Sequence, residues 1–188
     1  MSRFPSLPQT LQLGDVFTRF PAGIGALLEY HDALLRGPSP LSVAQREFLA
    51  AYVSGLNACR YCQGAHTIIA ELHGVQAETL ERALADPSTA GVEPEMMPML
   101  AYVKKLTESP SRMTDADASL VYAAGWDETA LFHAISVCAL FNFMNRIVDG
   151  CGVASDARTI EGVRERHKSL TNDPEAYRAF GRRLGILS

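Results

Sequence analysis

Four residues in the first half of the chain carry groups that could do chemistry together. Cys59 and Cys62 lie three residues apart, His66 follows one helical turn later, and Glu47 precedes Cys59 by twelve residues. A thiolate is a nucleophile, an imidazole accepts and returns protons, and a carboxylate can orient an imidazole. On an α-helix, Cys59, Cys62 and His66 project within a sector of roughly 60°. The spacing therefore predicts two thiols and an imidazole on one face.

The cysteine spacing favours a redox pair. Residues three apart on a helix have Cα atoms roughly 5 Å apart, a separation that a disulfide tolerates. The helix N-terminus and a neighbouring imidazolium are expected to lower a thiol pKa, which would make the thiolate accessible near neutral pH. Cys59 lies nearer the helix start than Cys62, so these residues alone leave open which thiol attacks.

Other interpretations of the four residues stay open beside this one. The thiols could be inert and buried, or the two cysteines could bind a tetrahedral metal ion with His66 and Glu47. A zinc finger or ribbon would need a second cysteine knuckle, which the sequence lacks. Glu47 could be a solvated carboxylate near a helix start and His66 an ordinary helix histidine. We expect no metal and no cofactor, and we expect an antiparallel helix pair to bring Glu47 over the thiols.

The elements that must position these groups are all predicted to be helices. Ser42 with Gln45, and Thr114 with Asp117, form capping-box patterns, and no segment alternates with the two-residue period of a strand. Residues 1–21 are expected to form an extended arm with a short turn at Leu11 to Val16. Helices are predicted at 22–36, 42–56, 57–74, 76–85, 94–108, 114–125, 127–148, 155–169 and 173–184, with Asn57 as the N-cap of the third.

An internal repeat appears when the chain is shifted by 72 residues along itself. Tyr30 then falls on Tyr102, Pro38 on Pro110 and Ser42 on Thr114, whereas Leu131 and Ala134 replace the two cysteines. We interpret this as an internal duplication of a helix-turn-helix unit that kept its chemistry in one half. The predicted organisation is an arm (1–21), a first helical repeat with the CxxC site (22–90), and a second repeat with the C-terminal helices (91–188), compact with the first.

Composition and charge narrow the function classes. The 188 residues are 47% hydrophobic and 20% charged, which is typical of a globular protein. A net charge of −4 with scattered Lys and Arg provides no basic surface for nucleic acid. We find no signal-peptide pattern and no window near the roughly 20 apolar residues of a membrane span. The predicted location is therefore the cytoplasm, with no membrane partner.

Glu47 and the segment Cys59-Arg-Tyr-Cys62-Gln-Gly-Ala-His66 resemble the motif of the alkylhydroperoxidase D-like and carboxymuconolactone decarboxylase superfamily in residue types and spacing. The later segment 141–150, Phe-Asn-Phe-Met-Asn-Arg-Ile-Val-Asp-Gly, is similar to the uncharacterised peroxidase-related branch of that superfamily. One departure is Tyr61, which stands where the best-known members carry a second histidine.

The resemblance implies an all-α bundle, a homo-oligomer and reduction of a small-molecule hydroperoxide. The electrons are expected from a thiol or dithiol reductant, either a small molecule or one borne by a protein. It places Cys62 as the cysteine that attacks the peroxide and Cys59 as its resolving partner. It assigns Glu47 and His66 to a proton relay. Two alternatives remain: a carboxymuconolactone decarboxylase-like enzyme, which would not depend on the thiols, and a non-enzymatic oligomeric redox sensor.

Several further residues have less specific interpretations. Cys138 and Cys151 are expected to be small buried residues. Tyr52 and Tyr61 are expected in the core, with a pocket wall as the alternative. A polar stripe on the predicted 127–148 helix is expected to make a subunit contact or an internal ion pair, with a pocket wall as the functional alternative. It comprises Asn142, Asn145, Arg146 and Asp149.

Overall fold

The computed structural model describes residues 2–188, so Met1 of the expected arm lies outside the described residues. Within that range no strand forms apart from an isolated parallel bridge between Leu11 and Val153, so the predicted all-α class is confirmed. The α-helices are α1 (Leu13–Arg19), α2 (Ile24–Leu35), α3 (Val43–Leu56), α4 (Arg60–Leu72), α5 (Thr79–Ala85), α6 (Met96–Glu108), α7 (Asp115–Ala123), α8 (Glu128–Cys151), α9 (Ala157–Lys168) and α10 (Ala176–Arg183). Two short 3-10 turns are η1 (Pro87–Thr89) and η2 (Pro110–Arg112).

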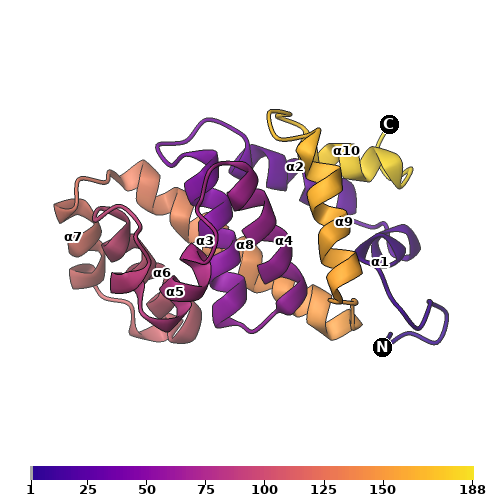
Figure 1. Ribbon diagram of the computed structural model, residues 1–188, viewed down its shortest axis with the longest axis horizontal. Coiled ribbons are helices and arrows are strands. Elements are labelled where there is room, and N and C mark those ends of the chain that lie inside the picture. Colours follow the sequence, from indigo (N-terminus) through magenta and orange to yellow (C-terminus); the bar gives the residue numbers. More distant parts are fainter. Residues whose placement is uncertain (1) are drawn as a thin grey trace.

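The helices form an elongated bundle (Figure 1). In that view α5, α6 and α7 lie at one end, and α3, α4 and α8 occupy the middle. The other end contains α1, α9 and α10, together with both ends of the chain. The thiol-bearing α4 therefore lies between the central helices and the C-terminal ones.

Helix α3 is the centre of the bundle. Every residue from Arg46 to Ser54 is buried, which is the pattern of a helix surrounded by other helices. It packs against α4, α8, α6 and α5. Its start is fixed by the predicted capping box, in which the Ser42 hydroxyl accepts from the Gln45 amide and the Gln45 side chain accepts from the Ser42 amide.

The C-terminal helices close over α2 and α4 through glycines. On α4, a Cβ at Gly64 would lie 3.1 Å from the Ile160 side chain of α9, so the missing side chain allows the two helices to approach closely. On α10, a Cβ at Gly181 would lie 2.7 Å from Leu28 of α2. These contacts bring α9 and α10 onto the part of the protein that holds the thiol pair.

The N-terminal segment differs from the expected extended arm. Residues 13–19 form helix α1, whose first turn is stabilised by a capping box between Gln12 and Asp15. Leu11, Val16 and Phe17 are buried in the main core. The segment contains Pro5, Pro8 and Pro21 and has no clear helical period, so the sequence did not predict this helix. The stability of so short a helix comes from tertiary packing.

The helix-turn-helix units of the proposed duplication are present as α2 with α3 and as α6 with α7. The second unit begins α7 with a Thr114–Asp117 capping box, as the pattern predicted. The origin of the two units by duplication, and the division of the chain at residues 21 and 90, stay predictions.

The prediction that no segment approaches a membrane span is wrong for helix α8. By length and composition alone, its 24 residues could cross a membrane, with a mean hydropathy of 1.4 in the most apolar window. However, 56% of that window is buried inside the protein. The helix packs against α3, α6, α2 and α4, as a core helix does.

Candidate active site

The helix pair α3–α4 brings Glu47 and His66 into direct contact. The Nδ1 of His66 lies 2.6 Å from Oε2 of Glu47, and both side chains are buried. The antiparallel return predicted from the sequence therefore places the carboxylate beside the imidazole. Because an ionised carboxylate only accepts hydrogen bonds, the Nδ1 nitrogen carries the proton, and Nε2 of the neutral ring is the proton acceptor.

Glu47 stays ionised although it is fully buried. Burial by itself would raise its pKa, but the charge of Arg36 and the hydrogen bonds from His66 and Arg36 outweigh burial and hold the pKa of Glu47 well below its usual range. Arg36 Nη1 donates to one carboxylate oxygen, and the hydroxyl of Tyr177 donates to the same oxygen at 2.9 Å. The carboxylate is thereby fixed from three sides.

Tyr177 reaches Glu47 because α10 is anchored on α2. The buried carboxylate of Asp32 accepts hydrogen bonds from the backbone amides of Tyr177 and Arg178, at 2.8 and 2.9 Å. It also accepts from Arg178 Nε at 3.1 Å. Asp32 thus satisfies free amides in the first turn of α10 from another helix, which is the role of an N-cap.

The thiol helix begins later than predicted. Asn57 is the C-cap of α3, and Cys59 is the N-cap of α4. The Asn57 side chain instead donates to Asn142 and Asn145 on α8, at 3.1 and 2.9 Å. The intervening Ala58 has φ 56°, a left-handed conformation that is uncommon for a residue other than glycine. A tight turn, which the sequence does not signal, therefore separates Asn57 from the helix.

Cys59 and Cys62 are both buried and form no disulfide, but their environments differ. Cys59 is fully buried and Cys62 is 3% exposed. The pKa of Cys62 is raised, chiefly by its hydrogen bond to Cys59 and then by burial, while a hydrogen bond to Asn145 acts in the opposite direction. The expectation of a lowered thiol pKa is therefore wrong for Cys62 in the dithiol state. A base is needed to generate its thiolate.

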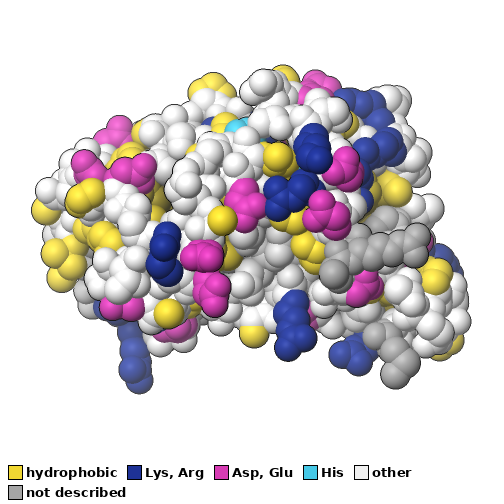
Figure 2. Space-filling view, in the orientation of Figure 1, with side chains coloured by type: hydrophobic (Ala, Val, Ile, Leu, Met, Phe, Trp, Pro, Cys, Tyr) yellow, Lys and Arg dark blue, Asp and Glu magenta, His cyan; other side chains and the backbone are white. Residues whose placement is uncertain are grey.

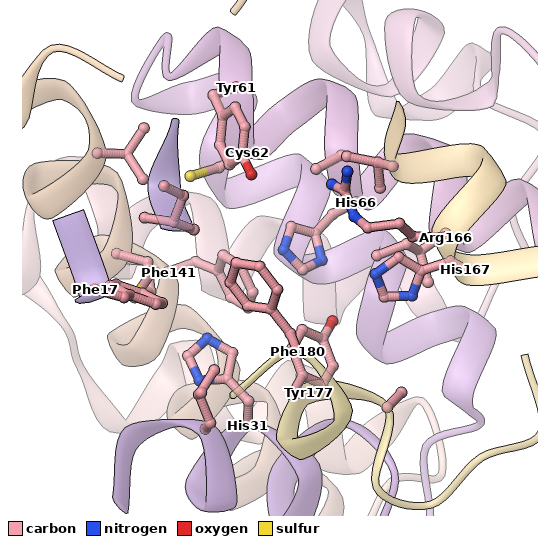
Figure 3. Close-up of a pocket in the computed structure, with 18 of the residues that line it drawn as sticks. Phe17, His31, Tyr61, Cys62, His66, Phe141, Arg166, His167, Tyr177 and Phe180 are labelled. Atoms are coloured by element: carbon pink, nitrogen blue, oxygen red, sulfur yellow. The ribbon is translucent and has the colours of Figure 1, made fainter. Parts of the chain in front are cut away.

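Cys62 and His66 face a common cavity of about 80 Å³ (Figure 3). That is room for several waters or the reacting end of a small organic molecule, and the cavity reaches the surface at the exposed Arg183. Cys62 and Tyr61 lie on one side, His31 and Tyr177 on the other, with Phe141 between them. Cys59 does not line the cavity. Only one thiol of the pair therefore meets a molecule that enters it.

Several residues that line the cavity were not predicted as site residues from the sequence. His31 and His167 line the wall, and burial lowers the pKa of each to about 4. Tyr177, Arg166 and Arg183 come from the C-terminal helices, more than 100 residues after the cysteine motif. Their contribution depends on how α9 and α10 pack, which no local pattern encodes.

The polar stripe on α8 connects helices and makes no Arg146–Asp149 ion pair among the described residues. Asn145 is buried and donates to Ser54 at 3.0 Å, in addition to accepting from Asn57. Arg146 donates to the side chain of Asn142 at 3.0 Å. The stripe thus ties α8 to the turn before the thiols.

The remaining tyrosines and cysteines have separate outcomes. Tyr52 is in the core, as expected. Tyr61 packs on the main core and also lines the cavity. Cys138 is buried, whereas Cys151 is only half-buried. Within residues 2–188, no group of three or more His, Cys, Asp and Glu side chains has the arrangement to hold a metal ion.

Comparisons with known proteins show what the sequence and the fold are similar to. Residues 21–105 match the sequence profile of the Carboxymuconolactone decarboxylase family. Seven solved chains match the fold significantly. One is an uncharacterized peroxidase-related protein from Silicibacter sp. TM1040, with 22% identity, a TM-score of 0.72, and coverage of 79% of this chain and 78% of that one. No significant match occurs among curated proteins.

A second similar structure is named alkylhydroperoxidase AhpD core, an uncharacterized peroxidase-related protein from Ralstonia eutropha JMP134. It is 21% identical with a TM-score of 0.73, over 80% of this chain and 79% of that chain. The family match spans all four candidate site residues, and the fold match spans most of the chain. The chain is thus similar to the Carboxymuconolactone decarboxylase family over the segment that carries the motif, and its all-α fold is that of the two peroxidase-related structures.

Proposed function

We propose that the protein is a thiol-dependent peroxidase in which Cys62 and Cys59 reduce a hydroperoxide with proton transfer by His66 and Glu47. One observation carries the proposal. Cys62 opens onto a cavity one helical turn from His66, while Cys59 lies behind it without access to the cavity. This is the arrangement needed for an attacking thiol and a protected resolving thiol.

In the proposed cycle the Cys62 thiolate attacks the terminal oxygen of the hydroperoxide. The O–O bond breaks, the alcohol leaves with a proton, and Cys62 becomes a sulfenic acid. The Cys59 thiolate then attacks the Cys62 sulfur, an S–S bond forms and water leaves. The peroxide has gained two electrons and the two thiols have lost them. A thiol or dithiol reductant resets the pair by exchange.

Two observations support the proposed proton relay: the raised pKa of Cys62 and the contact of His66 with Glu47. Because the Cys62 thiol is held protonated, Nε2 of His66 takes its proton before the attack and returns it to the departing alkoxide. Glu47 fixes the ring through Nδ1 and stabilises the imidazolium that forms in between. Arg36 and Tyr177 keep the Glu47 carboxylate in place.

Peroxide consumption with a dithiol donor tests the proposal. Wild-type protein, without any added cofactor, should turn over many equivalents of cumene hydroperoxide, and Cys62→Ser should lose this turnover. Cys151→Ser is the matched control, because Cys151 is a half-buried cysteine outside the cavity, and it should keep full activity. Loss of activity in both variants, or in neither, would refute the assignment.

Two other functions give different results in the same assay. The matched family is named for a decarboxylase, so a decarboxylase or related lactone enzyme using the cavity without the thiols is the second candidate. It would show no peroxide turnover. A non-enzymatic redox sensor would oxidise once for each reduction and show a stoichiometric burst without turnover. A cytoplasmic location, a homo-oligomer and the absence of membrane or nucleic-acid partners remain part of this proposal.

A further inference from the structure

Two arginines line the cavity without a carboxylate partner. Arg166 on α9 and Arg183 on α10 both contribute to its wall, and neither forms an ion pair within the described part of the chain. The polar contact of Arg183 is with a ring, its guanidinium lying 5.7 Å from the centroid of Phe180. In Figure 3 the Arg166 side chain extends from α9 toward the part of the cavity that holds His66.

The neighbouring arginines on the same two helices behave differently. Arg164 donates to Glu71 at 2.7 Å, and Arg182 donates to Glu175 at 2.9 Å, and neither lines the cavity. Figure 2 shows Lys and Arg side chains over the end formed by α9 and α10, with acidic side chains interspersed among them. Arg164 and Arg182 are thus neutralised, whereas the half-buried Arg166 and the exposed Arg183, which line the cavity, are not.

The cavity itself supplies no negative charge to these arginines. No Asp or Glu belongs to its lining. His31 and His167, whose pKa values burial lowers to about 4, are neutral near pH 7 and add no positive charge. Burial and then the nearby charge of Arg166 lower the pKa of Arg183, so the two guanidinium groups repel each other. An anion bound between them would remove this repulsion and accept several hydrogen bonds.

The rest of the wall is apolar. Its apolar side chains favour binding of a hydrocarbon chain. They include Leu13, Phe17, Leu28, Met144, Val148 and Val163. One cavity thus combines a thiol, an apolar wall and a cationic pair. A ligand that satisfies all three has a reactive group, an apolar body and an anionic end.

We propose that Arg166 and Arg183 form a carboxylate-binding subsite, so that the preferred substrate is a hydroperoxide with an apolar chain ending in a carboxylate. This substrate class rests on the proposed peroxidase function, but the subsite does not. The carboxylate lies between the two guanidinium groups, the chain lies along the apolar wall, and the hydroperoxide end meets Cys62.

Binding of octanoate, a carboxylate without a peroxide group, tests the subsite independently of catalysis. Isothermal titration should show octanoate binding to the wild type, and Arg166→Gln and Arg183→Gln should each weaken it about tenfold or more. The matched control is Arg182→Gln, which removes a neighbouring cation that lies outside the cavity. No binding to the wild type, or equal loss in the control, would overturn the proposal. Circular dichroism melting establishes that each variant is folded.

Kinetics then test the substrate class with ω-hydroperoxyoctanoate and its methyl ester. The wild type should favour the carboxylate by about tenfold or more in kcat/KM, and this ratio should fall toward one in Arg166→Gln and Arg183→Gln while Arg182→Gln keeps it. A wild-type ratio near one would refute the substrate class, even with peroxidase activity intact. Octanoate binding without turnover of either peroxide would instead refute the peroxidase function and leave the subsite supported.

Discussion

The hydroxyl of Tyr177 donates a 2.9 Å hydrogen bond to Oε1 of Glu47, across 130 residues of sequence. The last helix of the chain is thereby joined to the buried carboxylate that also holds His66. Burial and the charge of Glu47 raise the pKa of this phenol well above its usual value, so it remains a donor at all physiological pH values.

Tyr177→Phe should therefore destabilise the protein as well as slow the reaction. Removing a hydrogen bond to a buried charged group typically costs about 1.5–3 kcal/mol of unfolding free energy. Urea unfolding measures this change. Tyr30→Phe, at a tyrosine that is 47% exposed, is the control and should change the free energy by less than about 0.5 kcal/mol. Equal effects of the two substitutions would contradict a structural role for the Tyr177 hydroxyl.

The Cys59→Ser and Cys62→Ser variants should give different products after one pulse of peroxide. Cys59→Ser keeps the cavity-facing thiol, so Cys62 should oxidise once and stall as a sulfenic acid that dimedone labels. Cys62→Ser keeps only the buried Cys59 of the pair, and Cys59 should not be labelled. Mass spectrometry of the labelled peptides distinguishes them. Labelling of Cys59 in Cys62→Ser, with none of Cys62 in Cys59→Ser, would reverse the assigned roles.

The buried histidines predict that stability falls as the pH decreases from about 6.5 toward 4. The folded-state pKa of His31 and of His167 is about 4, against an unfolded value near 6.5. In this interval the unfolded chain binds more protons, so the free energy of unfolding rises with pH. His31→Asn, whose amide can replace the donor to the Leu27 carbonyl, should reduce the slope.

Urea midpoints measured across this pH range give both slopes, and equal slopes for wild type and His31→Asn would contradict the prediction.

Glu47 affects the free energy of unfolding at lower pH than the histidines do. Because its folded pKa is lowered, its contribution is present above the unfolded carboxyl pKa of roughly 4.3 and is lost as the pH falls below it.

An exposed apolar stripe on α8 supports the predicted homo-oligomer. Phe132 is 66% exposed and Phe143 is 50% exposed, unusual values for large apolar side chains on a core helix. Phe143→Glu should shift the protein toward a monomer near 20 kDa in multi-angle light scattering. Phe20→Glu, at an exposed phenylalanine outside α8, is the control. A wild type that is monomeric at micromolar concentration would refute the prediction.

The parts of the fold that depend on local chemistry were predictable. The capping residues Ser42 and Thr114 mark helix starts because each satisfies free amides through its own side chain. The contact between Glu47 and His66 was also predictable, because a short turn between two helices leaves few ways for them to pack.

The rest of the site depends on long-range packing. Asn57 was predicted to be the N-cap of the thiol helix, but its side-chain amide donates hydrogen bonds to α8. Ala58 adopts a left-handed conformation that the sequence does not suggest. Asp32 and Tyr177 meet only because α10 docks on α2, and neither residue stands in a recognisable motif. The pKa of Cys62 depends on its burial and its contact with Cys59, which a helical projection does not report.

The thiol chemistry and the wall of the cavity are encoded in separate stretches of the chain. Glu47, both cysteines and His66 lie within residues 21–105, whereas Phe141, Tyr177 and the two unpaired arginines follow after residue 140. Grafting the α9–α10 segment of a relative onto this chain, with Tyr177 retained to hold Glu47, should therefore exchange the choice of substrate while leaving the reactive pair untouched. The arrangement makes the C-terminal helices the natural place for new specificities to be selected, by evolution or in the laboratory.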